Sequence, residues 1–281
     1  MHKCDVCRKK DAVYKRIYSG HKLCLSCLEK ILARSVKRAI GDSNLLDPRS
    51  RILVPVRPSE PAHSLATIAL LARVEQKFDA TLILLIPQDL WNHPSISKII
   101  GLIERRVSLE VIVKEFPMPK TATTISCLRY ERAWSLYHAR SSNAAVVAFP
   151  ISRSCMNLTG LEALLSGNLE ALSESLPVLY WTKPPLFVPT IYIEAEALAA
   201  YAFLKGLYME PLCGFTVGAK IPLLSIMGRR PELEFSSNKT IMRIASKLTG
   251  LGKCRICGGF TSSGVVCRYC SETGASRLFP V

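Results

Sequence analysis

The segment RILVPVRPSEPAHSLATIALLARVEQKFDATLILLI, residues 51–86, runs from one apolar strand through a turn and an apolar helix into a second apolar strand. Both strands, RILVPV at residues 51–56 and TLILLI at residues 81–86, consist mainly of valine, isoleucine and leucine. Continuous apolar strands joined by a helix are typical of a parallel sheet that helices cover on both faces. The segment therefore predicts an α/β fold with a doubly wound parallel sheet.

The same alternation continues on the C-terminal side. It predicts two more strands, at residues 109–116 and 144–149, and two more helices, at residues 95–105 and 124–140, after the helix at residues 62–78 of the first segment. Beyond residue 149 the pattern becomes mainly helical, with helices expected at residues 157–176, 191–206 and 232–248 and a short apolar stretch at 178–181.

Eight of the eleven cysteines form two pairs of CxxC motifs that bracket this α/β region. The first set is Cys4, Cys7, Cys24 and Cys27, and the second is Cys254, Cys257, Cys267 and Cys270. A CxxC turn directs two thiolates at one ion, and a second CxxC completes a tetrahedral site with Zn–S bonds of about 2.3 Å. We predict two structural zinc sites. His21 could replace a thiolate of the first site, but we expect it to be solvated.

The alternative interpretation of the cysteines is a disulfide framework, which is typical of small secreted domains. The N-terminal sequence MHKC has no apolar signal segment, and no apolar run approaches the roughly 20 residues that span a bilayer. We therefore expect a cytoplasmic protein without a membrane partner.

Composition divides the chain into four parts. We predict an N-terminal zinc finger with a basic helix at residues 1–40, a linker at 41–50, an α/β domain at 51–228, and a helix with a C-terminal zinc finger at 229–281. The net charge is +15, of which residues 1–51 carry +8 and residues 236–281 carry +6. Positive charge that is concentrated on the small end modules favours a nucleic acid as partner, and a merely solvated basic surface is the alternative.

In doubly wound folds the ligand lies beyond the carboxyl ends of the strands, often at the loop after the first one. Here that loop is RPSEPAHS, residues 57–64. It contains no glycine, and Pro58 and Pro61 have no N–H to donate. The loop is therefore predicted to be a poor cradle for a phosphate.

The order of the parts resembles that of the two-zinc-finger PP-loop tRNA 2-thiouridine synthetases, which include the TtuA class and the cytoplasmic tRNA 2-thiolation proteins. The resemblance covers nearly the whole chain. It implies a PP-loop, HUP-like fold, tRNA as partner, and ATP-dependent replacement of a uridine oxygen by sulfur. These enzymes carry the motif SGGxDS after the first strand, where amide groups hold the pyrophosphate of ATP.

This sequence departs from that motif. Ser64 matches the last serine, but both glycines are absent and His63 stands in place of the aspartate. The residues left for a divergent ATP-binding loop are Arg57, Ser59 and Ser64, with help from Arg153. The second nucleotide-binding segment of the family, GHxxDD, corresponds to residues 148–153, which lack both acidic residues.

The sulfur-transfer cysteines of the resembled enzymes are a CxxC and a distant third cysteine, which hold an iron–sulfur cluster or pass sulfur through a persulfide. Cys127 matches the second position of that CxxC, Thr124 occupies the first, and Cys213 can be the third. Arg132 matches a basic residue of the family. The resemblance makes Cys127, Cys213 and Arg132 the candidate catalytic residues, and inert packing of the two cysteines is the alternative. We assign Cys155 to the core.

The sequence is consistent with three alternative functions. The first is a non-catalytic, tRNA-binding thiolation subunit that associates with a catalytic PP-loop paralogue or with a second copy of itself, without ATP or an iron–sulfur cluster. The second is an active ATP-dependent tRNA uridine 2-sulfurtransferase with a divergent loop. The third is an RNA-binding scaffold unrelated to thiolation.

Overall fold

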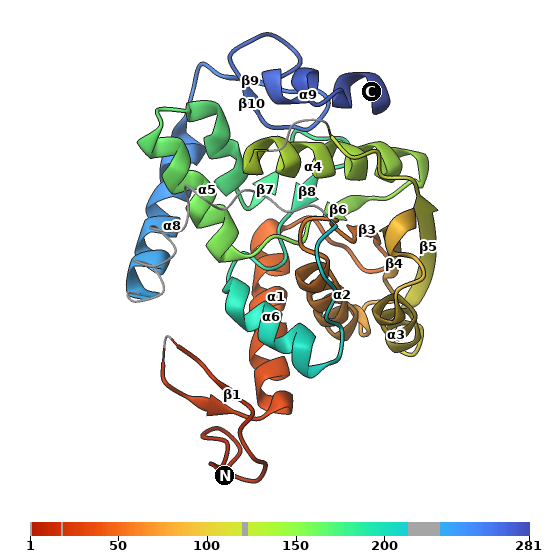
Figure 1. Ribbon diagram of the computed structural model, residues 1–281, viewed down its shortest axis with the longest axis vertical. Coiled ribbons are helices and arrows are strands. Elements are labelled where there is room, and N and C mark those ends of the chain that lie inside the picture. The colour runs from red at the N-terminus through yellow and green to blue at the C-terminus, as the bar shows by residue number, and fades with distance from the viewer. Residues whose placement is uncertain (1, 18, 120–122, 213–230) are drawn as a thin grey trace.

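The computed structural model describes residues 2–17, 19–119, 123–212 and 231–281, and the chain is seen in Figure 1 along its shortest axis. A six-stranded sheet lies at the centre of the described residues, in the order β5-β4-β3-β6-β8-β7. Its strands are β3 (Arg51–Pro55), β4 (Thr81–Pro87), β5 (Ser108–Lys114), β6 (Val146–Ala148), β7 (Val178–Leu179) and β8 (Leu186–Phe187). The predicted α/β fold is confirmed.

The sheet is parallel except at one edge. Ile52 of β3 is in register with Leu82 of β4 and with Val146 of β6. The edge strand β7 pairs antiparallel with β8. A parallel pair needs a long crossover connection, whereas β7 and β8 are joined by the short segment 180–185, so they can pair only as antiparallel neighbours. The sequence did not predict β8.

Helices cover both faces of the sheet. One hydrophobic cluster packs α1 (Leu25–Ser43), α2 (Pro61–Glu75), α3 (Pro94–Ile103) and α6 (Ala195–Leu204) on the first face. The other packs α4 (Thr124–Ser141), α5 (Arg153–Leu165) and α8 (Pro231–Lys247) on the second. Along β3, Ile52 and Val54 belong to the first cluster and Leu53 to the second. This alternation explains why the strand is apolar throughout.

Three helix boundaries differ from the predicted ones. The helix α1 runs to Ser43, into the expected linker, because Asn44 in the left-handed conformation ends it (φ 51°). The helix expected at 157–176 is two elements, α5 and the 3₁₀ helix η2 (Leu169–Ser175). They are separated at Gly167, which adopts φ 67°. The helix expected at 191–206 begins later, as α6.

The small modules lie at opposite ends of the long axis in Figure 1. The N-terminal module holds the hairpin of β1 (Tyr14–Lys15) and β2 (Lys22–Leu23) and projects beyond the start of α1. The C-terminal module, with β9 (Gly252–Lys253), β10 (Phe260–Thr261), α9 (Arg268–Glu272) and α10 (Ala275–Leu278), packs beside α4. Within the described ranges, no helix combines the length and apolar character needed to cross a bilayer.

Glu75, at the end of α2, makes the stability of the fold depend on pH. It is 3% exposed, and burial raises the pKa of its carboxyl to about 7. A carboxyl whose folded pKa exceeds its unfolded pKa, about 4.3, stabilises the fold below that value and loses the contribution as pH rises through 7. We expect Glu75→Gln to be more stable than the wild type by about 2 kcal/mol at pH 8 and by much less at pH 5. Thermal unfolding across this range measures the difference, and parallel profiles would contradict the prediction.

Candidate functional site

The carboxyl edge of the sheet, beyond the end of β3, holds the loop that the sequence singles out. The chain leaves β3 at Pro55 and enters α2 at Pro61, which is the first helical residue and whose missing N–H is not needed there. Residues 57–60 therefore lie at the N-terminus of α2, where a helix of this fold class would receive an anion.

Arg57 is turned into the protein at this loop. Its guanidinium is 1% exposed and forms ion pairs with Glu131, at 2.8 Å, and Glu60, at 2.7 Å. It also donates hydrogen bonds to the Pro150 carbonyl at 2.8 Å and to the Ser59 hydroxyl at 2.9 Å. Burial alone would lower the pKa of Arg57, but the negative charges of Glu131 and Glu60 outweigh it and raise the pKa. The predicted phosphate ligand is thus held by protein carboxylates.

The backbone amides of the same loop also have internal partners. The Ser59 N–H donates to the Glu131 carboxylate at 2.9 Å, and the Arg57 N–H donates to the Ser64 hydroxyl at 3.0 Å. The Glu60 N–H donates to the Arg57 carbonyl at 3.2 Å. Pro58 and Pro61 have no N–H. Every amide N–H between residues 57 and 61 therefore donates to another part of the chain.

Glu131 thus accepts hydrogen bonds from the Ser59 amide and from the Arg57 guanidinium. A nucleotide phosphate bound at this loop would accept hydrogen bonds from groups of the same kind. Glu131 lies on α4, is 2% exposed, and is 72 residues from Ser59 in the sequence. Cys127 is one helical turn before it and is also buried. The sequence alone did not identify Glu131 as a residue of this site. The signal for it is the run of charges at Arg129, Glu131 and Arg132 within an otherwise apolar stretch, since such charges are buried only when paired.

Arg153, in the segment that corresponds to the second nucleotide-binding motif of the family, also forms ion pairs within the protein. Arg153, at the start of α5, contacts Glu194 at 3.0 Å and Glu234 at 3.1 Å. Glu194 also contacts Arg16 of the N-terminal module at 3.4 Å. These ion pairs join α5 to the N-terminal module, to residue 194 before α6, and to α8.

The remaining candidate cysteines are placed only in part. Cys213 lies outside the described residues, so its meeting with Cys127 stays a prediction. Cys155, expected in the core, is partly buried at the edge of the second cluster, in the first turn of α5.

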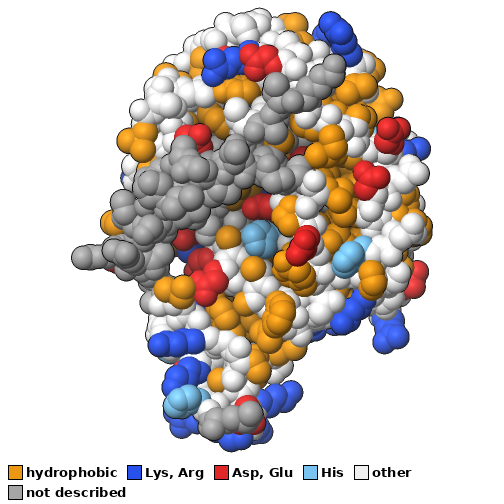
Figure 2. All heavy atoms as spheres, in the orientation of Figure 1, with side chains coloured by type: hydrophobic (Ala, Val, Ile, Leu, Met, Phe, Trp, Pro, Cys, Tyr) orange, Lys and Arg blue, Asp and Glu red, His pale blue; other side chains and the backbone are white. Residues whose placement is uncertain are grey.

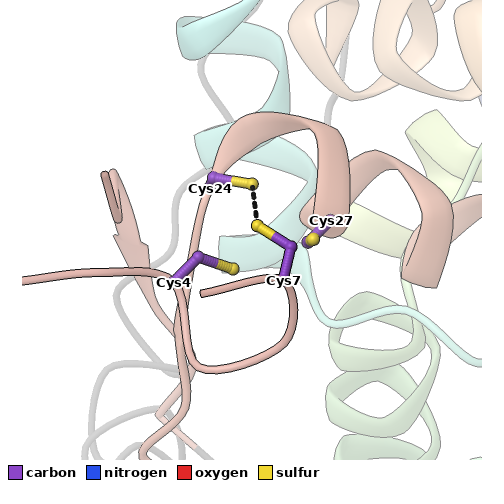
Figure 3. Close-up of side chains that lie close together, drawn as sticks. All are labelled: Cys4, Cys7, Cys24 and Cys27. Atoms are coloured by element: carbon purple, nitrogen blue, oxygen red, sulfur yellow. Dashed lines mark hydrogen bonds between the residues drawn. The ribbon is translucent and has the colours of Figure 1, made fainter. Parts of the chain in front are cut away.

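The N-terminal cysteines form one of two compact sulfur clusters (Figure 3). The side chains of Cys4, Cys7, Cys24 and Cys27 converge, and their sulfurs lie within 4.8 Å of one another. Cys7 and Cys24 Sγ are 3.8 Å apart. Burial would raise the pKa of the Cys4 thiol, but hydrogen bonds from the amides of Cys7, Cys24 and Val6 outweigh it and lower the pKa to about 6. His21 is exposed. These four residues could hold a metal ion.

The C-terminal cysteines form the second cluster, with sulfurs also within 4.8 Å of one another. The Cys254–Cys270 and Cys257–Cys267 sulfur pairs are each 3.8 Å apart. All four are buried inside the second hydrophobic cluster, so this set could hold a metal ion within the core.

Two buried arginines of α4 adjoin the C-terminal module. Arg132, a predicted catalytic residue, donates to the Cys257 carbonyl and binds Glu174 through two hydrogen bonds, at 2.7 and 3.0 Å. Arg129 binds the same carboxylate at 2.9 Å and donates to the Phe260 carbonyl at 3.0 Å. The pKa of the Cys257 thiol is well below its usual value, because hydrogen bonds within the cluster and the charge of Arg129 outweigh burial. The observed contacts of Arg132 are therefore with the C-terminal module and with Glu174.

Positive charge is unevenly spread over the surface. In Figure 2, Lys and Arg side chains gather at the lower end, over the N-terminal module and the start of α1. Acidic and histidine side chains are interspersed with apolar ones on the central part of this face. The predicted concentration of basic residues near the N-terminus is thus also visible in space.

Comparisons with known proteins support the fold. No family model matches the sequence, and no curated protein matches it. The structure is similar to that of U34-tRNA thiolase NcsA from Methanococcus maripaludis with its 4Fe-4S cluster, at a TM-score of 0.70 and 16% sequence identity. The similarity covers 100% of this chain and 97% of that chain. At this identity the likeness establishes a shared fold.

Proposed function

We propose that this protein is a tRNA-binding subunit of a tRNA thiolation system and that its carboxyl edge does not bind ATP. The observation that carries the proposal is the position of Glu131, which occupies both the Ser59 amide and the Arg57 guanidinium of the loop. A buried carboxylate that is already paired leaves no uncompensated positive charge for the phosphates of a nucleotide.

The likeness to a tRNA thiolase along the whole chain supports tRNA as the partner. The net charge of +15, concentrated at the two ends, suits the phosphate backbone of an RNA. A subunit that binds tRNA without activating it needs a catalytic partner. That partner would be a paralogue with an intact PP-loop motif, or a second copy of this chain that completes the active site in a homo-oligomer. Such a system would act in the cytoplasm.

We propose that zinc occupies both cysteine clusters. An ion with tetrahedral Zn–S bonds of about 2.3 Å separates its sulfur ligands by about 3.8 Å. The three sulfur pairs given above have this separation. A cluster of four iron atoms would spread the thiolates further apart. Elemental analysis of the purified protein should give about two zinc per chain and no iron, and stoichiometric iron would contradict the assignment.

Calorimetric titration of the tRNA-bound protein with Mg-ATP tests the central claim. We expect no detectable binding up to millimolar ATP. Micromolar binding, about −8 kcal/mol, would instead indicate an active synthetase with a divergent loop. Co-purification from the native cell should recover tRNA together with a PP-loop enzyme. Recovery of diverse RNAs without preference for tRNA would favour an unrelated RNA scaffold.

A substitution can test whether Glu131 replaces an anion. Glu131→Ala leaves Arg57 buried without one of its two carboxylate partners, which should destabilise the protein by about 3 kcal/mol. We expect millimolar pyrophosphate to restore part of the lost thermal stability, because an anion can accept the vacated hydrogen bonds. The wild type and Glu110→Ala, which removes a carboxylate that pairs with Arg51 at the surface, serve as controls. An equal response of all three proteins to pyrophosphate would contradict the role of Glu131.

A further inference from the structure

A basic groove lies between α1 and the end of α2, away from the loop at the carboxyl edge. It has a volume of about 360 Å³. Five basic side chains and one aromatic side chain line it. They are Lys30, Arg34 and Lys37 from α1, and Arg73, Lys77 and Phe78 from the end of α2 and the residues that follow. The first hydrophobic cluster holds the two helices side by side, as Figure 1 also shows.

The positive charges of the groove are exposed and mostly uncompensated. Lys30, Arg34, Lys37 and Lys77 are exposed and have no ion pair within the described part of the chain. Arg73 contacts Glu29, which is buried and does not line the groove, at 3.3 Å. No acidic side chain is among the described residues that line the groove.

The arrangement of these cations is unfavourable unless an anion binds. Lys30, Arg34 and Lys37 follow one another at spacings of four and three residues, so their side chains lie along one face of α1. Like charges at this spacing repel and destabilise a helix slightly. A row of phosphates along the groove would neutralise these cations and so relieve their mutual repulsion. The counterions released from the RNA would add to the free energy of binding.

Phe78 adds a second kind of contact. It is 41% exposed and lines the same groove next to Lys77. Exposed aromatic rings beside cations are the means by which proteins hold single-stranded or looped RNA, since the ring stacks on a base while the cations contact the backbone. Asp79 follows in the chain but does not line the groove.

The groove is spatially separate from the loop. The helix α2 begins at the carboxyl edge of the sheet and ends at its amino edge. Its 15 residues span about 22 Å at 1.5 Å per residue. The groove at its end can therefore hold RNA without contacting the loop that Glu131 closes.

We propose that the groove between α1 and α2 binds the phosphate backbone of an RNA strand and that Phe78 stacks on one of its bases. The proposal rests on the proposed function for the choice of tRNA as the RNA. It does not depend on whether ATP binds.

Fluorescence anisotropy with an unmodified tRNA transcript, over a series of salt concentrations, tests the groove. The groove variant carries Lys30→Gln, Arg34→Gln and Lys77→Gln, and the matched control carries Lys98→Gln, Arg105→Gln and Lys114→Gln in the α/β part of the chain, which are exposed and carry the same charge. We expect the groove variant to bind at least about 10-fold more weakly at 100 mM salt and to reduce the slope of log Kd against log salt by about 2 to 3. The control should change the affinity much less.

Phe78→Ala tests the stacking contact separately. We expect it to weaken binding by about 5- to 100-fold without a change in the salt slope, and circular dichroism should show that it is folded. Equal losses for the groove and control variants would overturn the groove and leave the proposed function intact. A wild-type protein that binds no tRNA would overturn both. An unchanged affinity for Phe78→Ala would overturn the stacking contact.

Discussion

The Cys257→Ser variant is expected to lose cooperative folding, whereas Cys4→Ser is expected to leave the α/β core folded. Cys257 is fully buried in the second hydrophobic cluster, where the C-terminal module packs against α4 and η2. Structural zinc, which we propose for this cluster, contributes about 10–16 kcal/mol at such a site, comparable to the whole stability of a typical domain, about 5–15 kcal/mol. Loss of this site should therefore unfold the C-terminal module and expose the part of the second hydrophobic cluster that it covers on α4 and η2.

The N-terminal site should behave differently. Its module projects from the body of the protein in Figure 1, and its loss should release mainly residues 2–23. Amide hydrogen exchange compares the two variants directly. Cys257→Ser should lose protection in β3 and α4, and Cys4→Ser should lose it only near the N-terminus. Equal loss of protection in the sheet would contradict this division.

The Glu174→Ala variant is expected to be less stable than the wild type by about 5 kcal/mol at pH 7. Glu174 is 5% exposed and is the carboxylate that both Arg129 and Arg132 bind. Removing one member of a buried charge pair costs about 3–5 kcal/mol because the other charge is left unpaired, and here two arginines are left. Chemical denaturation measures the change.

The control for this prediction is Glu174→Gln, which keeps the volume and one acceptor oxygen of the side chain but not its charge. We expect it to be destabilised by less than the alanine variant. A second comparison is Glu110→Ala, since Glu110 pairs with Arg51 at the surface and should contribute less than about 1 kcal/mol. If both alanine variants lost similar stability, the buried charge pairs would not be what stabilises this region.

The sequence predicts the strongest elements because their signals are local. The strands β3 and β4 and the helix α2 come directly from residues 51–86, and the spacing of the cysteines predicts both sulfur clusters. The strand β8 has two residues and no periodicity to detect. The end of α5 was misplaced because the glycine that ends it lies within an otherwise helical pattern.

The loop could be predicted only in part. The absence of glycine and the two prolines indicate a poor phosphate cradle, and the structure adds internal partners for its amides. The partner from α4 could not be predicted, because Glu131 and Ser59 are brought together only by the tertiary fold. The contacts of Arg132 were missed for the same reason, since its acceptors lie 42 and 125 residues away.

The internal carboxylate of Glu131 has a consequence for how the protein would respond to the metabolic state of the cell. A nucleotide-binding loop is ordered by a ligand whose concentration varies, so its conformation follows the supply of ATP. Here the acceptor belongs to the same chain, and its effective concentration is fixed by the fold. Under the proposed function, the loop would keep the same conformation during energy starvation and during growth, and the surface offered to a partner would not depend on the concentration of ATP.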